Sequence, residues 1–179
     1  MSRTTAIRIG AAAIVLAVAI VTVAAVTTAV IAAVGFAPAL RSWLGFSFAG
    51  VPSTPRAAIE IAVHNATIAA APLCAAVAYP RLGRRVRVGI SSALFVLLAI
   101  NAVVIGVAVG AYGERALDAL LPHALLEIAA FSIAGGAYTQ ACQQRVSHRV
   151  LAAATCLSFS MLACACAVEV LTTTSGGRS

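Results

Sequence analysis

Two pairs of ionisable side chains stand four residues apart within otherwise apolar stretches of the chain. Glu60 and His64 form the first pair, and His123 and Glu127 form the second. Side chains at positions i and i+4 share one face of a helix, so each pair should point in a single direction. Histidine titrates near neutral pH, and both residue types can exchange protons or bind a metal ion. Such residues are costly inside a membrane span and usually face the bundle interior, where they mark a functional site.

The composition requires that the elements carrying these pairs lie in lipid. Of 179 residues, 62% are hydrophobic and only 9% are charged, whereas soluble domains are about one quarter charged. So few charges cannot cover a surface that faces water, and a soluble globular protein is excluded. The net charge is +7. The arginines that supply it occupy short segments between apolar runs, which is typical of membrane proteins and does not favour nucleic-acid binding.

The apolar runs predict an all-α, polytopic bundle of about five transmembrane helices, forming a single membrane domain over residues 1–179. The first run is too long for the core of a cleaved signal peptide, so we expect a retained span. Pro72 should kink the second span. The aromatic-rich linker 35–56, which contains Trp43, should lie at the membrane–water interface, with a short amphipathic stretch around 39–48. The spans are expected at 8–34, 57–79, 88–112, 120–142 and 150–171, with loops at 113–119 and 143–149.

The arginines also predict an orientation. The N-terminus and the loops 80–87 and 143–149 fall on one side of a five-span chain and hold two, four and two arginines. The other side holds four. Because cytoplasmic segments carry the excess of basic residues, we expect a cell-membrane protein with a cytoplasmic N-terminus and an external C-terminus.

The depths of the ionisable residues predict which of them meet. The second and fourth spans run in the same direction, so equal distances from their starts give equal depths. Glu60 and His123 would both lie about 5 Å deep, and His64 and Glu127 about 10 Å deep, at 1.5 Å per residue. Facing helices would then form two complementary Glu–His pairs. Two asparagines complete the predicted polar intramembrane cluster: Asn65 beside His64, and Asn101 at about 15 Å.

Three interpretations of this cluster are open. The pairs could serve only as polar contacts between helices, each contributing about 1 kcal/mol. They could bind a proton, an ion or a polar headgroup. They could also form a zinc site from Glu60, His64, His123 and Glu127, at which a metal-bound water would hydrolyse a peptide or lipid. No H-E-x-x-H, P-loop or other catalytic motif is present, so no cofactor is expected and zinc is the alternative.

Small residues and cysteines suggest packing rather than chemistry. The five cysteines have no C-x-x-C spacing and are expected to act as small apolar side chains. Gly106-x-x-x-Gly110 should allow another helix to approach closely, either within the chain or in a homo-oligomer.

The segment "LLPHALLEIAAFSIAGGAYTQA" resembles the signature of the stage II sporulation protein M-like membrane family. Pro122, His123, Glu127 and Ala130 match its P-H-G-x-x-E-x-x-A pattern, and "IAGGA" matches the run of small residues that follows. The stretches "VHNATIAAAP" and "LLAINAVVIGVAVGAYG" resemble its two asparagine-containing spans. The resemblance covers residues 57–142 and the five-span layout. Ala124 and Ala102 stand where the family usually has glycine, which puts a close backbone approach there in doubt.

The resemblance implies a role in a membrane complex of the cell envelope. The family's namesake acts during engulfment in endospore formers, with partners that degrade peptidoglycan. Other members accompany circular-bacteriocin genes and are implicated in maturation, export or immunity. We therefore expect a non-catalytic envelope component that binds a partner protein, peptide or lipid. The alternatives are a metal-dependent intramembrane hydrolase or peptide-maturation factor, and a small proton-coupled transporter or immunity protein.

Overall fold

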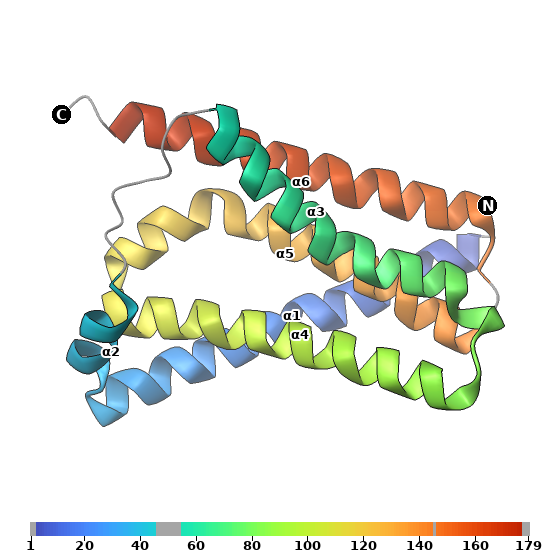
Figure 1. Ribbon diagram of the computed structural model, residues 1–179, viewed down its shortest axis with the longest axis horizontal. Helices are drawn as coiled ribbons and strands as arrows, with labels where there is room; N and C mark the ends of the chain where they lie inside the picture. The colour runs from blue at the N-terminus through green and yellow to red at the C-terminus, as the bar shows by residue number, and fades with distance from the viewer. Residues whose placement is uncertain (1–2, 46–54, 145, 177–179) are drawn as a thin grey trace.

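A computed structural model describes residues 3–45, 55–144 and 146–176 of the chain. Over these residues the chain forms a helical bundle with its two termini at opposite ends (Figure 1). The elements are α1 (Arg3–Val34), α2 (Ala37–Leu44), α3 (Pro55–Ala78), a 3-10 turn η1 (Tyr79–Arg81), α4 (Arg84–Tyr112), α5 (Glu114–Gln143) and α6 (His148–Gly176). The predicted all-α class is confirmed.

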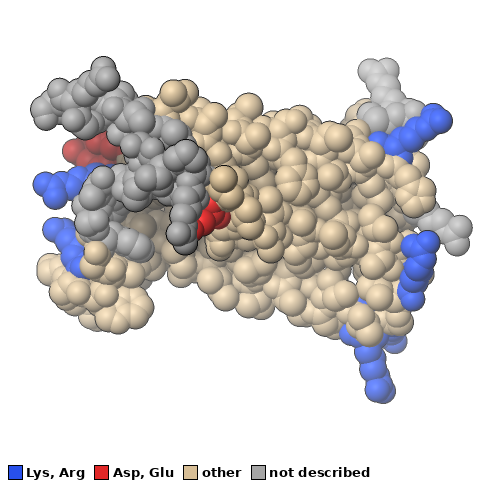
Figure 2. Space-filling model, turned by 45° about the horizontal axis from the view of Figure 1, so that its top comes forward, with Lys and Arg blue, Asp and Glu red and all other residues tan. Residues whose placement is uncertain are grey.

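Five of the helices, α1 and α3 to α6, are long and apolar enough to cross a membrane. Large apolar side chains cover their outer surfaces; Ile14, Phe95 and Leu125, for example, are 66%, 72% and 65% exposed. Figure 2 shows arginines at both ends of the molecule and a broad uncharged surface between them. A surface of this kind suits lipid, and the fold is that of a multi-pass membrane protein.

The two ends of the bundle differ in charge. All five acidic residues lie in the half of their helices nearer to α2, where α3 and α5 begin and α6 ends. The opposite end carries no acidic group in the sequence, and its arginines on described residues include Arg8, Arg81, Arg84, Arg85, Arg87 and Arg149. The end with more arginines therefore lacks acidic residues, and the other end holds all of them, so the two ends differ in charge by more than the arginines alone would give.

The spans begin and end close to the predicted positions, but the loop predicted at 113–119 is wrong. Only Gly113 interrupts the helices, with φ 60° and ψ −133°, and α5 starts at Glu114. Glycine can adopt a positive φ that other residues rarely adopt, so one residue suffices to reverse the chain. The polar residues 114–119 are the first turns of α5, which extend towards the membrane surface.

Helix α5 is the centre of the bundle. It packs against α1 on one side and against α3 and α6 on the other, while α1 also packs along α4. Helices α3 and α4 meet only near η1 and diverge from that turn (Figure 1). The bundle therefore consists of two groups that share α5: α1, α4 and α5 in one, and α3, α5 and α6 in the other.

Glycines allow α1 to approach both of its partners closely. A Cβ on Gly106 of α4 would lie 2.5 Å from the Ala24 carbonyl oxygen, and one on Gly136 of α5 would lie 2.7 Å from the Ile9 carbonyl oxygen. The Thr28 hydroxyl uses this proximity to donate to the Gly106 carbonyl at 3.1 Å. The Gly106-x-x-x-Gly110 motif therefore makes a contact within the chain, which is one of the two predicted alternatives.

The short helix α2 confirms part of the amphipathic stretch predicted at 39–48, of which residues 46–48 lie outside the described residues. It is fixed to the end of α4, because the Arg41 Nε donates to the Ala111 carbonyl at 2.5 Å and the Tyr112 hydroxyl donates to the Arg41 carbonyl at 3.3 Å. Trp43 is 80% exposed on this helix. Its position at the end of the apolar belt agrees with an interfacial location.

Candidate functional site

A hydrogen bond between α3 and α5 lies at the centre of the candidate site. The Asn65 Nδ2 donates to the Glu127 Oε1 at 2.5 Å. Asn65 is only 8% exposed, so its amide is removed from lipid and committed to this contact. A carboxylate inside a span needs such a donor, because an unsatisfied polar group costs several kcal/mol where no water can replace the partner.

His123 lies one helical turn before Glu127 on α5 and is also 8% exposed. Its Nδ1 is buried and has no hydrogen-bond partner. A neutral imidazole carries one donor and one acceptor nitrogen, and buried polar atoms are nearly always paired. An unused ring nitrogen beside a fixed carboxylate therefore has the capacity to bind a polar group or to take part in proton exchange.

Pro122 determines the path of α5 immediately before this histidine. Proline has no N–H and cannot bond to the carbonyl of the residue four positions earlier, which is Asp118 here. Figure 1 shows α5 bending in its N-terminal part. The bend directs the first turns of α5 towards α2 and α4, while the segment from His123 onwards packs between α1, α3 and α6.

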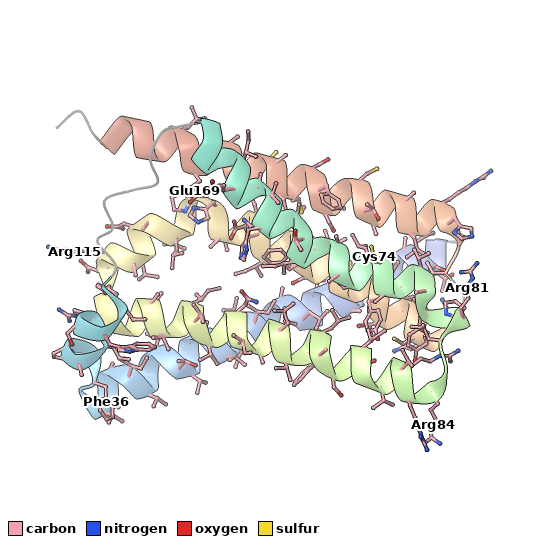
Figure 3. All side chains as sticks on the ribbon, viewed as in Figure 1. Phe36, Cys74, Arg81, Arg84, Arg115 and Glu169 are labelled. Atoms are coloured by element: carbon pink, nitrogen blue, oxygen red, sulfur yellow. The ribbon has the colours of Figure 1, made fainter. Side chains whose placement is uncertain are left out.

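Two further titratable groups on neighbouring helices lie close enough to interact electrostatically with Glu127. The electrostatic fields of His64 on α3 and Glu169 on α6 both reach the Glu127 carboxyl, together with that of His123. Figure 3 shows Glu169 between α6 and α5. The thiol of Cys166, one turn before Glu169, lies within reach of both carboxylates. Helices α3, α5 and α6 therefore all contribute polar groups to one region.

The site is closed on its inner side by apolar packing. Ala69 and Ala130 follow Asn65 and Glu127 by one turn, and both are fully buried against Leu162 of α6. The Ser158 hydroxyl donates to the Ala130 carbonyl at 3.0 Å and draws α6 against α5. This layer separates the polar residues from the arginine-rich half of the bundle.

The structure brings together part of the predicted cluster. Asn65, His123 and Glu127 are associated, and His64 lies within electrostatic range although its side chain is exposed. The Glu127 carboxyl bonds to Asn65, and the His123 Nδ1 is buried without a hydrogen-bond partner among the described residues, so the two predicted Glu–His pairs stay a prediction. Glu60 is exposed on α3, one turn before His64.

Asn101 lies apart from this cluster. Its Nδ2 donates to the Leu97 carbonyl of its own helix at 2.8 Å, and it lines a different cavity between α3 and α4. The sequence interpretation gave no role to Glu169 or Cys166, which the structure places beside the cluster. One signal was present: Glu169 is an acidic residue near the same end of its span as Glu127.

Within the described part of the chain, no three histidine, cysteine or acidic side chains are grouped so that they could hold a metal ion. The zinc interpretation rests on Glu60, His64, His123 and Glu127 and stays a prediction that metal analysis can test. The arrangement as it stands offers hydrogen-bonding and proton-exchange capacity at a carboxylate and an imidazole.

Comparisons with protein-family models, with curated proteins and with solved structures found no match to this chain.

Proposed function

We propose that this protein is a non-catalytic component of an envelope-associated complex, and that it binds a partner protein, peptide or lipid through the cluster of Asn65, His123 and Glu127. The observation that carries the proposal is the buried, unpartnered Nδ1 of His123 one turn from a carboxylate that Asn65 holds in place. A preorganised polar site with unused hydrogen-bonding capacity suits the recognition of a polar group that enters the membrane.

The resemblance to the stage II sporulation protein M-like family supports the same role. Its P-H-x-x-x-E pattern falls on Pro122, His123 and Glu127. These are the residues that bend α5, supply the free imidazole nitrogen and accept the bond from α3. On this proposal the motif describes a binding site and not only helix packing.

The charge asymmetry supports an orientation in the cytoplasmic membrane with the arginine-rich end inside. The N-terminus would then be cytoplasmic and the C-terminus external. The polar site would open towards the outer leaflet, where a partner in the envelope could reach it.

Site-specific photo-crosslinking tests the proposal. A benzoylphenylalanine at position 63, beside His64, should crosslink to a partner in the membranes of the source organism. Position 96, on the outer face of α4, is a matched control because Val63 and Val96 are similarly exposed, at 59% and 52%. The adduct at position 63 should fall severalfold when Glu127→Gln or His123→Leu is added. An adduct that neither change affects would contradict the proposal.

Metal analysis distinguishes the proposal from the hydrolase alternative. Mass spectrometry of the purified protein should find no stoichiometric zinc, in wild type or in His123→Ala. About one zinc per chain, lost in His123→Ala, would replace the binding role with a metal-dependent one.

A further inference from the structure

A second cavity lies outside the polar site, in the gap where α3 and α4 diverge. Its volume is about 190 Å³. Leu94 and Leu98 of α4, Ile68 and Pro72 of α3, Phe131 of α5 and Leu16 of α1 form its apolar walls. Because α3 and α4 do not pack together beyond η1, the cavity lies beside a gap between them that would face lipid in a membrane.

The cavity has the length of one lipid leaflet. Its lining on α4 runs from Ser91 to Asn101, and the rise between these two positions is about 15 Å. Half of a hydrocarbon core of about 30 Å is also about 15 Å. The rise from Arg85 to Ser91 adds about 9 Å, which is close to the thickness of the headgroup region on one side.

The end of the cavity nearest the membrane surface offers hydroxyl groups. Ser91 and Tyr138 share a 2.7 Å hydrogen bond between their hydroxyl oxygens. The pair places two hydroxyl groups at this end of the cavity, beside which an ester group can lie.

Positive charge lies beyond these hydroxyls, where α3 and α4 converge. Figure 3 shows Arg81 at the turn and Arg84 at the start of α4, both pointing outward from this corner of the bundle. Arg87 is engaged with the turn itself, donating to the Leu82 carbonyl at 2.7 Å and lying 4.7 Å from the centre of the Tyr79 ring.

Arg84 and Arg85 are exposed, and the described part of the chain contains no hydrogen bond or ion pair of theirs. The first turn of α4 also has no side-chain cap, so its backbone N–H groups favour an anion there.

We propose that the cleft between α3 and α4 binds an anionic phospholipid from the arginine-rich leaflet. One acyl chain lies in the cavity, an ester group lies beside Ser91 and Tyr138, and the phosphate lies near Arg84 and Arg85. These three features match the three parts of such a lipid in order. The apolar walls have the length of one leaflet, the hydroxyls lie at the depth of the esters, and the unpaired arginines lie at the surface. This site is independent of the polar cluster of α3, α5 and α6.

Native mass spectrometry of the full chain in detergent tests this proposal, with phosphatidylglycerol and phosphatidylcholine of identical acyl chains as the probes. Wild type should bind the first phosphatidylglycerol about 25-fold more tightly than the first phosphatidylcholine, since two arginines each contribute roughly a fivefold factor. Arg84→Gln/Arg85→Gln should remove most of this preference, because it removes both charges, and leave phosphatidylcholine binding unchanged. Arg115→Gln, at the opposite end of the bundle, is the charge control and should change nothing.

A second pair of variants tests the cavity. Leu98→Trp fills it and should weaken the binding of both lipids severalfold. Val104→Trp, on the lipid-facing side of the same helix, should not. Monodispersity and thermal unfolding of each variant show that it is folded. Equal binding of the two lipids by wild type would overturn the proposal, as would equal effects of Leu98→Trp and Val104→Trp.

Discussion

Asn65 of α3 donates a 2.5 Å hydrogen bond to Glu127 of α5, and this contact joins two helices that lie far apart in the sequence. Both residues lie near the layer formed by Ala69, Ala130 and Leu162, where α3, α5 and α6 meet. The bond therefore fixes the rotation of α3 against α5 at the level where the polar site ends and apolar packing begins.

Replacing Asn65 should destabilise the bundle. In Asn65→Ala the Glu127 carboxyl loses its donor, and we expect a loss of about 1–2 kcal/mol in the free energy of unfolding. Reversible unfolding in mixed detergent micelles measures it. Asn101→Ala is the control, because the Asn101 amide bonds to a carbonyl of its own helix, and its cost should stay below about 0.5 kcal/mol. Equal losses would mean that the Asn65–Glu127 bond contributes nothing specific.

His123 should behave in the opposite way, because its Nδ1 has no partner to lose. His123→Leu removes a buried, unsatisfied polar group, so stability should stay the same or rise by up to about 1 kcal/mol. The crosslink at position 63 should nevertheless fall severalfold. A residue kept at a cost to stability and needed for binding is a functional residue. A large loss of stability in His123→Leu would instead assign His123 to helix packing.

Hydropathy and arginine placement were sufficient to predict the five spans, because lipid imposes a minimum length and composition on every crossing helix. The depth of each residue along its span could also be predicted from the sequence, and His64, Asn65 and Glu127 were correctly placed at similar depths. Helix rotation could not be read in this way. Neighbouring residues on a helix differ by about 100° in direction, so the same depth allows Glu127 to face either His64 or Asn65.

Asn101 shows that the arrangement of the helices relative to one another could not be predicted from depth either. Its depth is close to that of Asn65 and Glu127, but α3 and α4 diverge after η1 and place it in the other cavity. Glu169 shows the reverse, since the sequence interpretation did not place this residue of the last span beside Glu127. Only the packing of α6 against α5 brings its field onto Glu127.

The approach of α1 to α4 should depend on Gly106. In Gly106→Ala the new Cβ would meet the Ala24 carbonyl oxygen at 2.5 Å, so the helices must separate. We expect a loss of about 1–3 kcal/mol in the free energy of unfolding. Gly89→Ala on the same helix is the matched control, because nothing lies within 4 Å of a Cβ at that position, and it should be neutral or slightly stabilising. A free energy of unfolding that Gly106→Ala leaves unchanged or raises, as Gly89→Ala should, would show that the close approach of α1 to α4 does not depend on Gly106.

The proposed orientation can be tested by cysteine labelling in a chain whose own cysteines are replaced by alanine. Ser147, between α5 and α6, and Ser42, on α2, are exposed at opposite ends of the bundle. A membrane-impermeant maleimide should label Ser42→Cys in intact cells and Ser147→Cys only after the membrane is permeabilised. The reverse pattern would invert the orientation. Labelling of both in intact cells would contradict five spans.

Trp43 allows the position of α2 to be measured without a label, because it is the one tryptophan in the sequence. Its side chain is 80% exposed, and Arg41 holds its helix at the end of α4. If α2 lies in the interface, lipids brominated near the headgroup should quench Trp43 fluorescence more strongly than lipids brominated near the chain end. Arg41→Ala, which removes the contact with the Ala111 carbonyl, should reduce this difference because α2 is no longer held at a fixed depth. Quenching that is equal for both lipids in wild type would place Trp43 away from the interface.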